Sequence, residues 1–293
     1  MIMLYSLKAM QAAGTLEGTN ITVFRTGDEE NAGEPLTVSR GAFIEAGKAS
    51  EAAIEFEGGS RSNGRDFATI ARRSAFTWRL KTTGVEGHSS GIFTERAGSG
   101  AIYEISRILA AFESQLKEPD LTYNVGVIVG GSNVTFDPIK NTGTAIRKSN
   151  IIASSAYATG DIRTVSDNQL KSVRERTKSI VAKHLPQADA EIAFEDKYPS
   201  MAATDGNKAL LKVLNGVNLD LNMEAMEALP PSKRGAGDVS FVAPYVDSIS
   251  GFGSLGGGAH APGETVDLSR QSLQTKRTAL FLYRLTRSAT RRI

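Results

Sequence analysis

The chain interrupts one succession of helical and extended patterns with a different one, and this interruption limits the folds open to it. Residues 1–13 repeat apolar side chains at helical spacing, 21–24 form a β-branched run, and 36–49 and 52–56 repeat the same pair of patterns. Alternation of helix and strand is typical of a mainly parallel sheet covered by helices. The first part of the chain is therefore predicted to belong to an α/β domain with a buried strand at 21–24.

The middle of the chain has another order of elements. Its patterns are strand, helix, strand, strand, helix and strand, over residues 76–80, 101–116, 123–129, 151–162, 165–184 and 190–194. This is the order of a ferredoxin-like α+β domain, and the stretch has the length of one small domain. Helix and strand alternation then resumes from Thr204 and ends in a helical pattern over 269–287. The sequence therefore predicts that one domain is inserted into another.

The predicted boundaries follow from these patterns. Residues 1–73 plus 198–293 are expected to form the α/β domain, and residues 74–197 the inserted α+β domain. The stretch 58–65 is rich in glycine and arginine, and we expect it to act as a hinge between them.

Composition excludes several classes of function. The 34 basic and 32 acidic residues give a formal net charge of +2 and alternate along the chain, so no basic face indicates nucleic acid binding. The absence of cysteine excludes disulfides, thiol nucleophiles and thiolate zinc sites. The first residues lack the basic region of a signal peptide and the length of a membrane span, so we expect a cytoplasmic protein with no membrane partner.

Two adjacent glutamates, Glu29 and Glu30, follow the apolar run at 21–24. Successive side chains on an extended backbone point opposite ways, so one carboxylate can hold a metal ion while its neighbour takes a proton from water. A solvated acidic turn is the alternative. Glu57 follows the second predicted strand, and His260 lies in a glycine-rich loop. Because ligands collect at the carboxyl ends of parallel strands, these side chains are candidates for one site.

A series of motifs runs in order along nearly the whole chain. They are ITVFRTGDEE, AAIEFEG, GVEGHSSGIF, GSGAIYEISRIL, NVGVIVGGSNV, GDIR, GAGDVSFVAP and GGGAHAPGETVDL. In this order they resemble the co-catalytic zinc peptidase family of glutamate carboxypeptidases, aminoacylases and succinyl-diaminopimelate desuccinylases. The resemblance implies a hydrolase of amide (peptide or N-acyl amino acid) or ester bonds, with a small-molecule or peptide substrate. It also implies that the inserted domain is a lid that forms a homodimer.

The resemblance assigns roles to five residues. Glu29 matches the family's general base, and Glu30 and His260 match the ligands of one zinc ion. Glu57 matches a terminal ligand of the other zinc ion. His88 matches the lid histidine that reaches the active site of a partner subunit and stabilises the developing oxyanion.

Three further residues match less specific positions of the family. Asn133 and Arg163 correspond to lid residues that hold the carboxylate of the substrate. Asp238 corresponds to a structural aspartate near the metal loop.

The chain departs from the family at its start. Members carry an early HxD motif and an aspartate that bridges the two metals, both before the helix that here spans 1–13. We therefore expect an N-terminally truncated, incomplete catalytic domain. A catalytic zinc usually takes three protein ligands and a water. With two ligands left for one ion and one for the other, we expect one weakly held zinc ion rather than two, or none.

Two alternatives to metal-assisted hydrolysis stay open. One is a catalytically inactive remnant that acts only as a dimeric fold. The other is a metal-independent esterase with Ser89 as nucleophile, because residues 87–91 satisfy GxSxG. A nucleophile elbow needs a helix directly after the serine, whereas the helical pattern resumes only near Ala101, which favours a lid loop.

Overall fold

The computed structural model describes residues 1–146 and 148–287, which fold into two compact units. Met1–Arg73 and Ser200–Ile293 form unit 1, and Ser74–Pro199 form unit 2. The predicted fold class, an α/β domain with an inserted α+β domain, is confirmed.

Unit 1 combines helices with short strands. Its helices are α1 (Ile2–Ala12), α2 (Leu36–Ser39), α3 (Gly41–Lys48), α6 (Asp205–Asp220) and α7 (Gln271–Arg287), with 3₁₀ turns η1 (Glu29–Asn31), η3 (Pro231–Lys233), η4 (Asp238–Phe241) and η5 (Leu268–Arg270). Its strands are β1 (Ala53–Ile54), β2 (Ser60–Ser62), β3 (Arg65–Ala68), β13 (Glu227–Ala228), β14 (Ser248–Ile249), β15 (Gly256–Gly257) and β16 (Thr265–Val266). β1 pairs in parallel with β14 and β3 with β13, while β2–β3 and β15–β16 are antiparallel hairpins.

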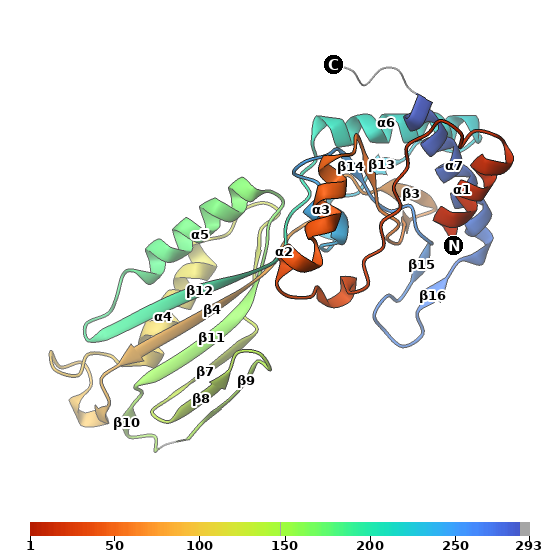
Figure 1. Cartoon of the computed structure of the whole chain (residues 1–293). Helices are drawn as coiled ribbons and strands as arrows, with labels where there is room; N and C mark the ends of the chain where they lie inside the picture. The colour runs from red at the N-terminus through yellow and green to blue at the C-terminus, as the bar shows by residue number, and fades with distance from the viewer. Residues whose placement is uncertain (147, 288–293) are drawn as a thin grey trace. The chain divides into compact units, whose positions relative to one another are not determined.

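The core of unit 1 lies between these helices and the paired strands. Leu210, Leu214 and Val217 repeat at helical spacing on α6, and all three are buried. They belong to one apolar cluster with Ile249 of β14 and Phe281 of α7. α7 packs against both α1 and α6 (Figure 1).

The predicted buried strand at 21–24 is wrong. These residues belong to none of the described strands, and Val23 and Phe24 are 41% and 40% exposed. The Phe24 ring packs on Phe43 of α3, with 5.1 Å between ring centroids. The β-branched composition was a correct sign of extended backbone, but a strand also needs a neighbour, and the part of the chain that the structure describes supplies none here.

The predicted hinge at 58–65 is also wrong. This stretch contains β2 and the start of β3, joined by a tight turn at Asn63 and Gly64. Both turn residues have positive φ, 50° and 79°, as the turns that suit two-residue hairpins require. The glycine and asparagine therefore mark a hairpin inside unit 1, and the chain passes into unit 2 further on, at Arg73–Ser74.

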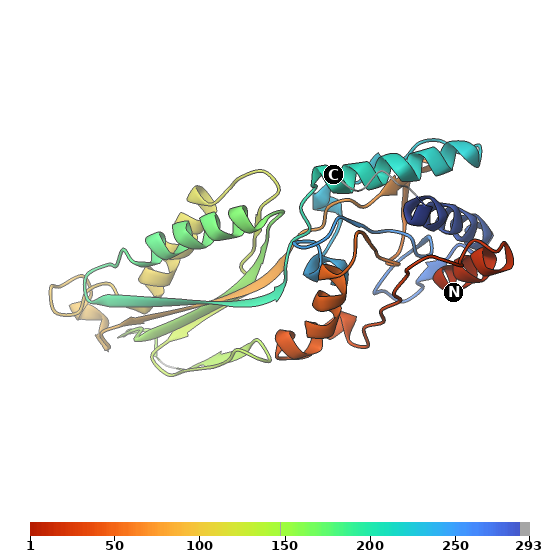
Figure 2. The same ribbon diagram turned by 45° about the horizontal axis from the view of Figure 1, so that its top comes forward.

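Unit 2 is an antiparallel sheet with two long helices. Its elements are β4 (Ala75–Gly84), β5 (Gly87–His88), η2 (Ser89–Gly91), α4 (Ala101–Gln115), β6 (Thr122–Tyr123), β7 (Val127–Gly131), β8 (Val134–Asp137), β9 (Thr142–Ala145), β10 (Ile151–Ile152), β11 (Ser155–Arg163), α5 (Asp167–Val181) and β12 (Ala188–Tyr198). The main sheet has the order β12-β4-β11, with β6 and β7 both pairing the far side of β11. α4 and α5 cover one face of it (Figure 2).

The alternating pattern of β4 explains why the helices cover that face. Phe76, Trp78 and Leu80 are buried and pack in one cluster with α4 and α5, while the residues between them are only half-buried. In the pairing of β4 with β11, Trp78 lies opposite Gly160. A Cβ on Gly160 would lie 1.8 Å from the carbonyl oxygen of Asn124, which also accepts a hydrogen bond from the Trp78 indole, at 3.1 Å.

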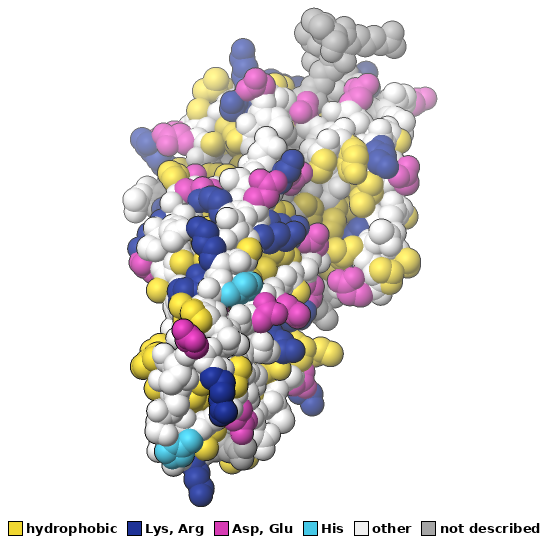
Figure 3. Space-filling model, turned by 90° about the vertical axis from the view of Figure 1, so that its left-hand side faces the viewer, with side chains coloured by type: hydrophobic (Ala, Val, Ile, Leu, Met, Phe, Trp, Pro, Cys, Tyr) yellow, Lys and Arg dark blue, Asp and Glu magenta, His cyan; other side chains and the backbone are white. Residues whose placement is uncertain are grey.

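One element of unit 2 was not predicted. β8 and β9 form a separate hairpin, and Phe136 in β8 stacks on Tyr157 in β11 with 5.4 Å between ring centroids. Its strands have only four residues each, and β9 carries no large apolar side chain, so the pattern was too short to detect. On the face of the molecule in Figure 3, Lys and Arg side chains are interspersed with Asp and Glu.

Candidate active site

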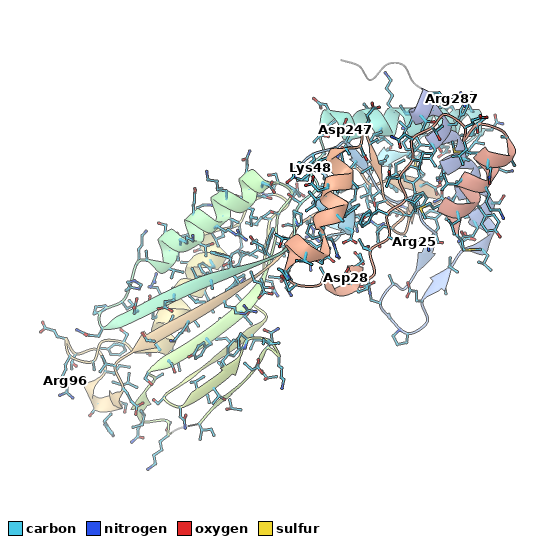
Figure 4. The ribbon with its side chains drawn as sticks, in the orientation of Figure 1. Arg25, Asp28, Lys48, Arg96, Asp247 and Arg287 are labelled. Atoms are coloured by element: carbon cyan, nitrogen blue, oxygen red, sulfur yellow. The ribbon has the colours of Figure 1, made fainter. Side chains whose placement is uncertain are left out.

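A buried arginine fixes the loop that carries the acidic cluster. The structure breaks the helix predicted over 36–49 at Arg40, whose side chain is fully buried. Arg40 Nη1 lies 2.6 Å from Asp28 Oδ1, and Arg40 Nε donates to Asp238 Oδ1 at 3.0 Å. Asp28 lies in the loop between α1 and α2 (Figure 4) and accepts the Gly33 amide at 2.6 Å. The Gly33 amide and the Arg40 guanidinium both lower the pKa of Asp28.

Glu29, the predicted general base, is partly buried among other carboxylates. Burial and, after it, the charges of Glu57, Asp238, Glu30 and Glu55 together raise its pKa to about 7. The predicted base and two predicted metal ligands, Glu30 and Glu57, therefore lie within electrostatic reach of one another in unit 1. A carboxyl group with a pKa near neutrality can both take and give a proton at physiological pH.

Glu30 and His260 meet although they lie far apart in the sequence. His260 Nδ1 is 3.8 Å from Glu30 Oε2, and each side chain is 77% exposed. His260 belongs to the loop between β15 and β16 and has a positive φ of 62°. Non-glycine residues in this region carry strain and occur often at functional sites. The pairing of these two residues is the contact that the metal hypothesis requires.

Glu57, the third predicted metal ligand, has a different neighbour. Its Oε2 lies 3.7 Å from Nη2 of Arg72, which is 3% exposed. Arg72 also pairs with Glu55, which lies two residues before Glu57 in the sequence. The sequence analysis did not single out Glu55 or Arg72, and only the proximity of the β1 and β3 segments brings them together.

The donor set tests whether a metal centre fits these residues. No group of three or more His, Asp or Glu side chains within residues 1–146 and 148–287 is close enough to hold an ion. Asp238 is 7% exposed, and its Oδ2 is buried without a hydrogen-bond partner. Glu30 and His260 make a pair of candidate ligands, one fewer than the three protein ligands that a catalytic zinc usually takes.

His88 lies in unit 2, at the end of β5. Its Nδ1 is 2.9 Å from Ser90 Oγ and accepts the Ser90 amide at 3.2 Å. Because the amide can only donate, Nδ1 is the acceptor and the proton of a neutral ring lies on Nε2. Asn150 Nδ2 is 3.2 Å from that Nε2. Since an amide nitrogen can only donate, the Asn150 side-chain amide must be turned so that its oxygen lies here and accepts the Nε2 proton. Ser90 and Asn150 were missed by the sequence analysis, since Asn150 comes close only through the pairing of β5 with β10.

Asn133 and Arg163 lie at opposite ends of β11. Asn133 follows Gly131, which pairs with Ser155 at the start of the strand, whereas Arg163 is its last residue. Eight residues of strand span roughly 26 Å. Arg163 is also paired with Asp161, at 3.0 Å. One copy of unit 2 therefore cannot place both side chains on the same substrate carboxylate, and that either residue binds such a carboxylate stays a prediction.

Comparison with known proteins agrees with the fold. Residues 70–189 match the family model described as a peptidase dimerisation domain. A search of curated protein sequences found no match. Within residues 1–146 and 148–287, no helix is long and apolar enough to cross a membrane.

Three solved structures resemble the chain. Aminopeptidase PepT from Bacillus cereus is 12% identical with a TM-score of 0.70, over 96% of this chain and 68% of that one. A tripeptidase from Staphylococcus aureus is 15% identical with a TM-score of 0.59, over 83% and 62% of the two chains. The YXEP protein of Bacillus subtilis, a dinuclear metal-binding peptidase, is 14% identical with a TM-score of 0.57, over 85% and 60%.

These likenesses concern the fold, because all three identities are low. The chain matches only 68%, 62% and 60% of the length of these structures, so it spans roughly two thirds of each. Its middle part carries a peptidase dimerisation domain, and its whole described fold is that of solved peptidases.

Proposed function

We propose that the protein hydrolyses amide or ester bonds in the manner of zinc-dependent carboxypeptidases and aminoacylases, and that it works as a homodimer through unit 2. The observation that carries this proposal is the meeting of Glu30 with His260, 3.8 Å apart, directly beside Glu29. The contact joins a predicted metal ligand of the acidic loop to the predicted ligand of a loop about 230 residues further along the chain. The similar structures are those of an aminopeptidase, a tripeptidase and a metal-binding peptidase, and they support the same class of reaction.

The proposed chemistry assigns one task to each residue. Glu30 and His260 would hold a divalent cation, which when bound supplies a Lewis acid that polarises a carbonyl group and acidifies water. Glu29 takes the proton of the attacking water and passes it to the leaving nitrogen or oxygen. The raised pKa of Glu29, about 7, supports this transfer in both directions.

His88 has the proposed task of stabilising the oxyanion in the active site of the partner subunit. Its ring supports this task, because Nδ1 is held as an acceptor and Nε2 therefore carries the proton, which faces Asn150 in this structure and would donate to the oxyanion in its place. Asn150 supports it further by fixing the ring from the other side. Asn133 and Arg163 could hold the same substrate carboxylate only if the two residues come from different subunits.

The test of this function is a panel of dipeptides, N-acyl amino acids and simple esters, assayed with added Zn²⁺, Mn²⁺ or Co²⁺ and after EDTA treatment. We expect metal-dependent hydrolysis that His260→Ala reduces at least about 100-fold. His184→Ala, a histidine of unit 2 outside the site, should leave the rate unchanged. If no substrate is turned over with any metal, the inactive dimeric fold is favoured instead.

A second candidate function is metal-independent ester hydrolysis in unit 2. Ser90 Oγ lies 2.9 Å from His88 Nδ1, and Asn150 holds the other ring nitrogen, which is the arrangement of a nucleophile, its base and an orienting group. The sequence favoured Ser89, but in the structure the Ser89 amide donates to the Asn150 carbonyl at 2.9 Å, and it is the Ser90 hydroxyl that meets the His88 ring. Activity that survives EDTA, is lost in Ser90→Ala and is kept in Ser89→Ala would establish this function.

A further inference from the structure

Arg72 is the centre of a charged cluster in unit 1 that includes a predicted metal ligand. Its side chain is 3% exposed, and its Nη1 pairs with Glu55 while Nη2 lies 3.7 Å from Glu57 Oε2. Nε and Nη2 also donate to the carbonyl oxygens of Gly235 and Ala236, at 3.1 and 2.7 Å. All three guanidinium nitrogens therefore have partners.

The backbone fixes the position of this guanidinium. A Cβ on Gly237 would lie 2.4 Å from Arg72 Cζ, so glycine is needed there for the guanidinium to lie against the chain. Ser250 Oγ accepts from Nη1 at 3.1 Å on another side. Arg72 cannot swing away without losing these contacts.

Glu55 is fully engaged by the same cluster. Its Oε1 accepts the Val239 amide at 2.9 Å, and its Oε2 accepts from Ser250 Oγ at 2.5 Å as well as from Arg72. A carboxylate with this many donors is held in place as a structural partner of the arginine.

Glu57 is the carboxylate of the cluster that reaches solvent. Its side chain is 37% exposed. The guanidinium of Arg234 is also within electrostatic range of Glu57. Burial and the neighbouring Arg72 lower the pKa of Arg234, while the charge of Glu57 raises it. Arg234 is anchored by a hydrogen bond to the Gly58 carbonyl. The Arg72 guanidinium therefore lies 3.7 Å from the residue predicted to hold a second metal ion, and the Arg234 guanidinium interacts electrostatically with that residue.

A divalent cation at Glu57 would stand within about 4–6 Å of a permanent positive charge, and charges of the same sign repel strongly at this distance in a partly buried site. The carboxylate that should attract the ion already has Arg72 as a partner, at 3.7 Å, although Glu55 is the closer partner of that guanidinium. Glu30 and His260, in contrast, are both exposed and pair with each other.

We infer that Arg72 supplies at Glu57 the positive charge that a second metal ion would bring, so that the protein binds one divalent cation, at Glu30 and His260. The inference rests on the proposed function only in taking Glu30 and His260 as ligands. It assigns Glu57 to an ion pair with Arg72.

The test is a titration of EDTA-treated full-length protein with Zn²⁺ alone, followed by calorimetry and by metal analysis after gel filtration. The wild type should bind one ion per chain. Glu57→Gln should also bind one ion, with a dissociation constant within about threefold of the wild type, while Glu30→Gln should weaken binding by about tenfold or more. Glu45→Gln, an exposed glutamate of α3 in the same unit, is the matched control.

Several results would overturn the inference. Two ions per chain in the wild type, no ion at all, or a tenfold loss of affinity in Glu57→Gln would each contradict it. Because no substrate is present, a protein that binds one ion in this way but hydrolyses nothing would contradict the proposed function alone. A protein that hydrolyses amides with two ions would contradict this inference alone.

Discussion

Unit 2 and unit 1 are stabilised in different ways. In unit 2, β4 and β11 run for 10 and 9 residues, and Trp78 of β4 has no exposed surface. The described strands of unit 1 have two to four residues, and between them lie arginines that are nearly inaccessible, Arg40 at 0% and Arg72 at 3%. Apolar packing along long strands needs few specific contacts, whereas loops held by buried ion pairs place individual carboxylates accurately. The difference fits the proposal that ion pairs hold the carboxylates of the site in unit 1, while unit 2 presents His88 from a rigid apolar frame.

Removing the largest core side chain of unit 2 should have the largest effect on stability. Trp78→Ala leaves a cavity under α4 and removes the indole hydrogen bond to Asn124, so we expect a loss of about 4 kcal/mol. Hydrogen exchange should accelerate in β4 and β11 and stay unchanged in α6 and α7. A loss below about 1 kcal/mol would contradict the role given to apolar packing in this unit.

The second-largest loss of stability should follow from removing a buried cation of unit 1. Arg40→Met leaves the buried Asp238 without its cation, and we expect a loss of about 3 kcal/mol near pH 7. Exchange should accelerate in unit 1 and not in unit 2, the reverse of the Trp78 variant. Arg163→Met, which removes an exposed ion pair of unit 2, is the matched control and should cost less than about 1 kcal/mol.

The effect of Arg40→Met should depend on pH. Because Arg40 and Gly33 lower the pKa of Asp28, its contribution to stability is present above the unfolded-state pKa and is lost as pH falls through the lower folded-state value. The difference between wild type and Arg40→Met should therefore shrink as the pH is taken below about 4 in urea denaturation. A difference that is the same at all pH values would show that the Arg40 ion pairs contribute nothing.

The smallest effect on stability should come from Glu29→Gln, with the opposite sign. The folded-state pKa of Glu29, about 7, lies above its ordinary value of 4.5, so ionisation costs stability as pH rises from about 4.5 to 7. Glutamine removes this cost. In EDTA, the variant should gain about 1 kcal/mol over wild type at pH 8 and little at pH 4.5, a figure reduced because Glu29 is only partly buried. An equal gain at both pH values would contradict the carboxylate cluster.

The sequence predicted the two kinds of unit unequally well. The helices of unit 2 were found within three residues at each end, 101–116 for α4 and 165–184 for α5, because apolar residues recur at helical spacing. In unit 1, the run at 21–24 and the stretch 58–65 were misread. Local pattern shows that backbone is extended or turning, but the existence of a partner strand is decided elsewhere in the chain.

The candidate site shows the same limit. Glu29, Glu30, Glu57 and His260 could be named because their motifs follow a known order. Arg72 could not, since its contacts with Glu55, Ser250 and the 235–237 backbone join segments that are distant in sequence. Nothing in the sequence around Arg72, which is followed by a second arginine, indicates that its side chain is buried. The counter-ion of a site is therefore harder to predict than its ligands.

The central claim is that Glu29 serves as the proton carrier of a hydrolytic site in unit 1. It is tested most directly by kcat/KM for an N-acyl amino acid or dipeptide, measured with saturating Zn²⁺ or Mn²⁺ in Glu29→Gln and in the matched surface variant Glu45→Gln. The account predicts a fall of about 100-fold or more in Glu29→Gln and a change within about twofold in Glu45→Gln. Equal rates in the two variants would contradict it.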